Sequence, residues 1–353
     1  MISFFTLCVS AIFAEQCLSP FNVTKSLLII SAINALVFLT FSQVRGDTAF
    51  YSRNQNPFIQ VFGLPAAESA ALTEKNQIDG RVVLDLANNF SLGVTDNERI
   101  ILDGESNRIT CAFRYGLTES VELGFDIPYI SHERGTLDNF ISDWHDFFGL
   151  PDGDRDNRNP KLLEYEYEKN GDVLHRTDSA SHGLGDIFVS SAFLLYGNKA
   201  QSRNISLRLS LKLPTGSSED LHGSGGTDFS WRLAADDALS LSSWKITYWG
   251  SAGLLFLGKG DVLEEIRNDL VGFGSMGAGW KIFDWAHLKL QLDGHTAVFD
   301  SALEELGDGA VQLNMGTTIH FDHDLSLDLN VIEDIMVNSS PDVVFHVAIR
   351  KKL

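Results

Sequence analysis

Hydrophobic and polar residues alternate along most of the chain from Arg81 onward. The stretch 205–213 shows the pattern most clearly, with Ile or Leu at every odd position and Ser, Arg or Lys at every even position. The stretches 121–129, 286–295 and 311–321 repeat it. Because successive side chains of a β-strand point to opposite faces, this period of two predicts strands with one apolar and one polar face.

The connections between these strands fall into two classes of length. Those after even-numbered strands are short, such as 117–119 and 283–285, whereas those after odd-numbered strands are mostly longer, such as 92–105 and 131–185. Transmembrane barrels have this arrangement, with short periplasmic turns, long outer loops and both termini in the periplasm. We therefore predict an all-β fold, a transmembrane antiparallel β-barrel of about twelve strands with a short N-terminal periplasmic or plug segment. The predicted strands lie near 81–91, 106–116, 120–130, 186–196, 203–213, 228–236, 243–257, 269–282, 286–298, 310–321, 324–334 and 342–352.

A soluble sandwich or lipocalin is the alternative, because alternation by itself does not identify the solvent. Such proteins have no reason to sort their loops by side, which favours the barrel. Aromatic residues at the strand ends also suggest the two girdles of a membrane barrel, although Phe and Tyr are good strand residues in any case. They are Tyr115, Tyr196, Trp244, Phe283, Trp285 and Phe321 at the predicted periplasmic ends, and Tyr129, Phe256 and Phe299 at the outer ends.

Residues 1–42 are predicted to be a signal peptide. A second apolar run, 27–41, follows Lys25, and Thr40 and Ser42 are small residues at the positions that a signal peptidase requires. An earlier apolar run makes two in tandem, so we hypothesise that translation starts near Val23. Residues 43–80 are then predicted to be an N-terminal collar or plug. Their apolar character disfavours the alternative, a disordered lead-in. The barrel spans 81–353.

Composition narrows the classes of function. The chain has 27 Lys and Arg against 47 Asp and Glu, a net charge of −20, which excludes a general nucleic-acid binder because phosphate contacts need a basic face. Past residue 42 no apolar run is long enough for a membrane helix. The mature chain keeps Cys111 as its single cysteine, so it can form no intramolecular disulfide. The mean hydropathy of −0.01 is the value expected when the strands have one apolar and one polar face, because the two faces average to near zero.

The outer loop 131–185 is too long for a plain turn. It carries 12 acidic and 6 basic residues and has apolar anchors at Trp144 and Phe148. Loops of this size form lids, plugs or binding elements. We leave open whether it folds over the mouth or is an ordered surface loop.

The polar face of the predicted strands carries charges of both signs, which either pair across the lumen as structural plugs or line a polar pore. With the 53–56 segment and two residues of the outer loop they form the candidate lumen and mouth. The candidates are Arg53, Asn54, Gln55, Asn56, Arg108, Arg114, Glu122, Asp126, Trp144, His145, Arg208, Lys212, Arg232 and Lys289.

Several short motifs resemble those of a proteobacterial outer-membrane family that carries only an unknown-function label. They include the RNQNP, FGLPDG, GLGD and KLPTG motifs, which begin at Arg53, Phe148, Gly183 and Lys212, and the resemblance covers about 50–353. The GLGD and LPTG stretches are also similar to barrels associated with phenol-degradation pathways and to hydrophobic-compound channels. The resemblance implies an outer-membrane barrel and suggests a channel. It implies no catalytic residue and no particular substrate.

The function we predict is passive uptake or binding of a small amphipathic or hydrophobic molecule, without a cofactor or a metal. The expected location is the outer membrane of a Gram-negative cell. The expected partners are its lipid and lipopolysaccharide, the barrel assembly machinery and an unknown small molecule. Two alternatives stay open. One is a hydrolase with a site on the rim, for which Ser181-His182 and His132 offer a nucleophile and bases. The other is a structural or lipopolysaccharide-interacting barrel without transport.

Overall fold

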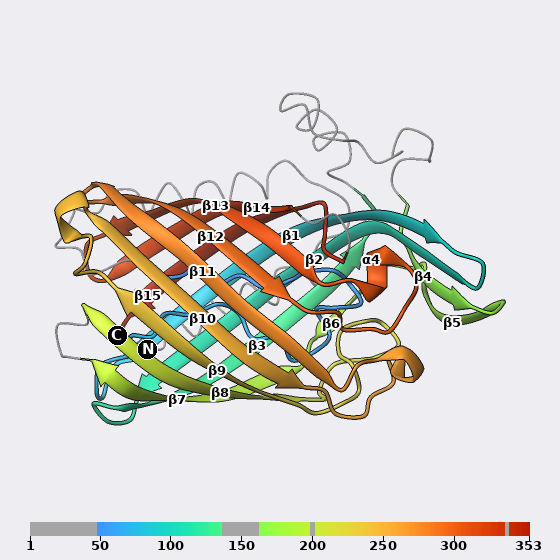
Figure 1. Cartoon of the computed structure of the whole chain (residues 1–353), viewed down its shortest axis with the longest axis horizontal. Coiled ribbons are helices and arrows are strands. Elements are labelled where there is room, and N and C mark those ends of the chain that lie inside the picture. The colour runs from blue at the N-terminus through green and yellow to red at the C-terminus, as the bar shows by residue number, and fades with distance from the viewer. Residues whose placement is uncertain (1–47, 136–161, 198–201, 336–338) are drawn as a thin grey trace.

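The structure is a computed structural model, and it describes residues 48–135, 162–197, 202–335 and 339–353. Twelve of its strands form a barrel, and three short ones follow one of its connections (Figure 1). The barrel strands are β1 (Ile78–Val94), β2 (Glu98–Gly116), β3 (Val121–Glu133), β7 (Ile187–Gly197), β8 (Arg203–Leu213), β9 (Asp228–Asp237), β10 (Ile246–Phe256), β11 (Leu270–Phe283), β12 (Ala286–His295), β13 (Ala310–Phe321), β14 (Leu325–Asp334) and β15 (Val343–Lys352). The short strands are β4 (Glu164–Lys169), β5 (Asp172–Thr177) and β6 (Ser181–Leu184).

Each barrel strand pairs antiparallel with its neighbours, and the first strand pairs with the last. β1 meets β15 from Asp79 opposite Lys352 to Asn88 opposite Val343, which closes the sheet. β3 pairs with both β2 and β7, so β4 to β6 leave the barrel wall unbroken. Closure leaves no open edge, as a barrel in a membrane requires. The prediction of a twelve-stranded antiparallel barrel is confirmed.

One predicted connection is wrong. Residues 92–105 do not form a long loop, because β1 and β2 continue to Val94 and Glu98 and are joined by three residues. β4 pairs with this extension of β2, and β5 pairs with β4. The three consecutive apolar residues Ile100, Ile101 and Leu102 are all buried. Burial on both faces removes the alternation by which a strand is recognised from sequence.

The remaining elements are short. The predicted start of β10 at 243 is replaced by the 3-10 turn η2 (Ser242–Trp244), and the connection before β11 holds η3 (Glu264–Ile266). α4 (Glu304–Gly307) lies between β12 and β13. Of the helices in the described residues, none is long and apolar enough to cross a membrane.

The two faces of the barrel wall differ as the alternation predicts. On β12, Leu288 and Leu290 are 48% and 57% exposed, whereas His287 and Lys289, which alternate with them along the strand, are buried. Of the predicted aromatic girdles, five of the six residues near the strand ends that carry the C-terminus are exposed, with Trp244 reaching 72%, and the sixth, Phe321, is half-buried. At the opposite end two expectations are wrong, because Tyr129 and Phe299 are buried. Tyr129 lies 6.4 Å from the His182 ring of β6, and Phe299 packs in an apolar cluster under the loops.

Candidate functional site in the barrel interior

Residues 48–77 run through the interior of the barrel as a hairpin (Figure 1). The ascending arm follows β12 in steps of two residues. The backbone N–H of Phe50 donates to Gln291 Oε1 at 2.9 Å, the Ser52 hydroxyl donates to Asp293, and Asn54 Nδ2 lies 2.9 Å from His295 Nε2. These contacts match an extended strand-like arm to the inward face of one wall strand.

The RNQNP motif forms the turn at the top of this hairpin. Asn54 Oδ1 accepts a hydrogen bond from the backbone N–H of Asn56, and Asn56 Oδ1 accepts one from Phe58 N–H. The Asn56 carbonyl then accepts from Ile59 N–H at 2.9 Å. Asn side chains that bond the backbone two residues on, followed by Pro with its fixed φ, are suited to such a turn. The motif therefore has a structural explanation within this segment.

The descending arm follows β9 back toward the end where the termini of the barrel strands lie. Gly63 N–H donates to Asp228 Oδ2 at 2.8 Å, and Ala70 and Ala71 N–H groups donate to Asp236 at 3.0 and 2.9 Å. The arm leaves the barrel where Ile78 N–H bonds the Leu353 carbonyl, and there β1 begins.

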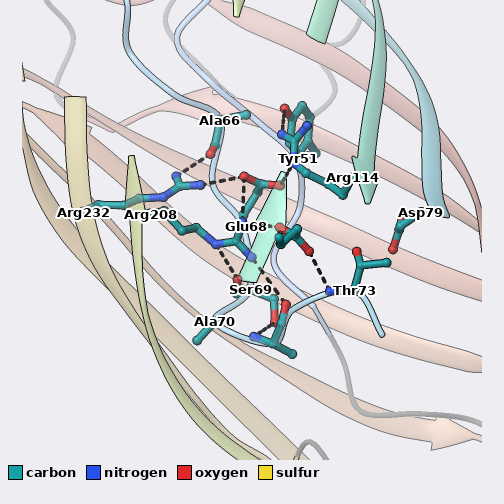
Figure 2. Close-up of polar contacts among 12 residues, drawn as sticks. Tyr51, Ala66, Glu68, Ser69, Ala70, Thr73, Asp79, Arg114, Arg208 and Arg232 are labelled. Carbon is teal, nitrogen blue, oxygen red and sulfur yellow. Dashed lines mark hydrogen bonds and ion pairs between the residues drawn. The ribbon is translucent and has the colours of Figure 1, made fainter. Parts of the chain in front are cut away.

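Glu68 of the descending arm is shared by three arginines from three wall strands (Figure 2). Its carboxylate accepts from Arg114 Nε at 2.9 Å and Arg232 Nη2 at 3.0 Å, and lies 3.5 Å from Arg208 Nη1. The arginines also bind wall carboxylates: Arg114 pairs with Asp126 and Arg208 with Glu122. We call these six residues the Glu68 cluster. All are buried, and Tyr51 completes it by donating to Asp126.

The other described candidates lie along the same interior. Lys289 donates to the Thr48 carbonyl at 2.9 Å, and Gln55 Nε2 donates to Asp85 at 3.1 Å. Arg53 lies 3.7 Å from Asp126, while Arg108 is fully buried and donates to the Gln60 carbonyl at 3.4 Å. Trp144 and His145, with the FGLPDG motif, lie outside the described residues.

Lys212 links two of the sequence motifs at one point. Its ammonium group pairs with Asp186 of the GLGD motif and donates to Ser224 in the loop before β9. The same carboxylate accepts from the backbone N–H groups of Thr215 and Gly216 in the KLPTG motif. Lys212 also donates to the Val61 carbonyl of the hairpin at 3.1 Å. These contacts connect the loop ends of β7, β8 and β9 to one another and to the hairpin.

The turn of the hairpin is covered by an apolar cap. Phe58, Ile59, Val61, Phe62 and Leu64 pack with buried residues of the loops and strand extensions. The residues that cover them include Ile100, Leu102, Tyr165, Tyr167, Leu257, Val262, Ile266, Phe299 and Leu306. The interior is therefore polar and ionic around the two arms of the hairpin, and apolar around its turn beneath the loops.

A group of histidines lies at the edge of this cap. Ser181 Oγ is 3.2 Å from His222 Nε2, and the rings of His222 and His132 stack at 5.6 Å. His175 on β5 meets the Phe58 ring edge-on at 5.5 Å. Burial lowers the pKa of His175 to about 4 and that of His222 below its ordinary value. In the part of the chain that the structure describes, no group of three or more metal-ligating side chains is gathered.

Two small cavities flank the descending arm. The larger, of about 40 Å³, lies between the hairpin and the wall from β9 to β13, and the smaller, of about 20 Å³, adjoins the Glu68 cluster. Arg53, Pro65 and Arg232 line both. A water molecule needs roughly 10–15 Å³ by this measure, so each cavity has room for only a few waters.

Sequence reasoning missed several residues on which this arrangement depends. Glu68 lies between small residues in a segment without periodicity, Asp186 was recognised only as part of the GLGD motif, and Asp228 only as the start of a predicted strand. No local pattern singles out Glu68. The available signal is the combination of an acidic residue in a predicted plug with surrounding strands rich in inward arginine.

Comparison with known proteins places the fold among outer-membrane barrels. The COG4313 outer membrane channel from Pseudomonas putida F1 is 13% identical, over 80% of this chain and 97% of that one, with a TM-score of 0.52. The NanC porin is 7% identical over 78% and 100% (TM-score 0.44), and the CymD monoaromatic hydrocarbon channel is 8% identical over 87% and 94% (TM-score 0.39). At these identities the likeness concerns the fold alone. A comparison with curated proteins finds no match. The model of the family described as protein of unknown function (DUF3187) matches residues 26–353, which confirms the resemblance seen in the motifs, and the chain belongs to that family.

Proposed function

We propose that this protein is a passive outer-membrane channel for a small molecule, and that residues 48–77 are a plug that closes its lumen. The observation that carries the proposal is the way in which the interior is filled. The descending arm, including Glu68, is held by ion pairs and hydrogen bonds to the barrel wall, not by packing in a dry apolar core. Polar contacts of this kind can be exchanged for water or for a polar solute, because each one has an equivalent partner in solution.

Passage requires the plug to move. The two cavities beside the descending arm each have room for only a few waters, which supports a closed lumen while both arms are docked. A barrel of twelve strands without an internal segment has room for a narrow, water-filled lumen. The apolar cap offers a second surface for the hydrocarbon part of a solute, which would reconcile a charged lumen with an amphipathic cargo.

The orientation follows from the same geometry. The long connections and the cap lie at one end, and the short turns lie with the C-terminus at the other. In outer-membrane barrels the short turns face the periplasm. This supports an outer-membrane location with both termini periplasmic and the cap at the cell surface, with outer-membrane lipid, lipopolysaccharide and the barrel assembly machinery as partners.

A reversible lock tests the channel. Because the side chains of Ser52 and Asp293 meet, with Ser52 Oγ 2.5 Å from Asp293 Oδ2, the pair Ser52→Cys/Asp293→Cys is chosen for a disulfide between plug and wall. We expect the oxidised protein to block current in planar bilayers and the reduced protein to conduct. Ser52→Cys alone, treated with the same oxidant, is the control. Equal currents in the oxidised and reduced double variant would contradict the role of the plug, and no current in any form would contradict the channel.

Hydrolysis at the rim is a second candidate, favoured by one contact, the 3.2 Å approach of Ser181 Oγ to His222 Nε2. A serine nucleophile needs such a base within hydrogen-bond reach. Hydrolysis of a short-chain ester that is lost in Ser181→Ala and retained in Ser217→Ala, a loop serine outside this contact, would support an enzyme. Equal rates in the two variants would reject it.

A further inference from the structure

The larger cavity carries three hydrogen-bond donors that have no acceptor. Arg53, Arg232 and Gln312 line it. Their atoms Arg53 Nη1, Arg232 Nε and Gln312 Nε2 are buried and have no hydrogen-bond partner among the described residues. A buried donor left without an acceptor costs about 1–3 kcal/mol, and more when it belongs to a charged group. Three such donors at one cavity therefore call for a ligand that accepts.

The acceptors around this cavity are already used. Asp293 accepts hydrogen bonds from three neighbours, Ser52, Gln291 and Asn314. The hydroxyl groups of Ser251 and Ser275 bond each other at 2.8 Å. Among the described residues that line the cavity, no side-chain oxygen is both buried and unpartnered. A water could accept from two of the three donors but would bring two donors of its own, whereas an anion brings acceptors only.

We propose that this cavity binds the carboxylate of a small organic acid, and that such acids are the class of molecule that the channel carries. The second part rests on the proposed function. A guanidinium N–H from each of Arg53 and Arg232 would form a charge-assisted hydrogen bond with a carboxylate. Leu64, Pro65 and Phe273 line the same cavity and offer an apolar surface to the hydrocarbon body of the acid. A molecule with one charged and one apolar end fits both features.

Binding is coupled to the plug through Arg232. Its other two nitrogens donate to the plug, Nη1 to the Ala66 carbonyl and Nη2 to Glu68 at 3.0 Å. The cavity of about 40 Å³ accepts a carboxylate group, but the body of the acid needs the space that the plug occupies around Pro65. A ligand that engages Arg232 thus competes with the plug for this side chain and favours the undocked arm.

Calorimetric titration of the full chain in detergent tests the site. The probes are sodium acetate and sodium benzoate, with acetamide and benzamide as neutral counterparts and sodium chloride as a competing anion. The site variants are Arg53→Gln and Gln312→Leu. The matched controls are Arg81→Gln and Gln60→Leu, which remove residues that also carry unpartnered buried atoms but do not line the cavity.

We expect saturable binding of both carboxylates and none of the amides. Affinity should fall at least about tenfold in the site variants, the loss of one charge-assisted contact, and less than about twofold in the controls. If Arg53→Gln does not fold, Gln312→Leu still tests the site. The Gln312 amide nitrogen has no hydrogen-bond partner among the described residues, so its removal breaks no contact of that nitrogen within the protein.

Three results would overturn the inference: no saturable carboxylate binding by the folded protein, equal affinities in site and control variants, or chloride binding as tight as acetate binding. The lock experiment separates this inference from the channel. A protein that conducts when reduced but binds no carboxylate remains a channel without this site. A protein that binds carboxylates and never conducts keeps the site and loses the channel.

Discussion

Glu68→Gln is the substitution that measures how firmly the plug is held. The amide keeps the shape of the side chain but removes the charge that faces Arg114, Arg208 and Arg232 at 2.9, 3.5 and 3.0 Å. Arg114 and Arg208 keep Asp126 and Glu122 as partners, but Arg232 loses the carboxylate with which it pairs. Removing one partner of a buried ion pair costs about 3–5 kcal/mol, because the remaining charge stays buried without compensation. At about 1.4 kcal/mol per factor of ten, the docking equilibrium of the descending arm should fall by about two to four orders of magnitude.

Hydrogen exchange followed by mass spectrometry reads this change directly. The amides of Ala70 and Ala71 bond Asp236 when the arm is docked, so their protection should fall with the docking equilibrium. Conductance should rise in parallel, while the wall strands keep their protection because their ladder is untouched. Glu119→Gln, in an exposed turn of the barrel, is the control. Unchanged exchange and unchanged conductance in Glu68→Gln would refute the reasoning.

Three further predictions concern the cap, the motifs and the lipid face. Burial lowers the pKa of His175 from its ordinary 6.5 to about 4, so the stability that its neutral form gives is fully present above pH 6.5 and is lost as pH falls toward 4. Proteolysis of the β4–β5 hairpin should therefore accelerate on acidification. His175→Gln should reduce this pH dependence without removing it, because burial also lowers the pKa of His222 nearby. Asp186→Asn should lower the midpoint of unfolding in urea, because Lys212 loses one of its two buried carboxylate partners, and an unchanged midpoint would show that the other partner, Asp228, suffices. Leu290→Lys should cost about 2–4 kcal/mol for folding into lipid vesicles, and a neutral effect would argue against lipid on that face.

Much of the barrel could be predicted because its signal is local. Each strand must present apolar side chains to one side and polar side chains to the other, and this requirement repeats every two residues wherever the wall has one wet and one apolar face. The alternation at 205–213 and 286–295 therefore predicted both the strands and the inward position of residues such as Lys212 and Lys289. It failed at 100–102, where both faces are covered.

The candidate site was harder, since its contacts join residues far apart in the chain. Arg114, Arg208 and Arg232 could be assigned to the inward face one strand at a time, but their common partner Glu68 lies 46, 139 or more positions away in a segment without a period. The apolar character of the segment predicts a plug, but nothing in its local pattern identifies Glu68 as the partner of the three arginines.

What the sequence determined by itself was the architecture of the wall: strands of alternating character, loops sorted by length, and a polar inward face. The tertiary structure alone decided how that interior is used. In the structure β1 pairs with β15, and the RNQNP turn lies at the loop end of the barrel. One arm of the hairpin follows β12 and the other follows β9. The physical reason is that periodicity reports the environment of a single strand, whereas the partner of a buried charge is chosen by proximity after the barrel has closed.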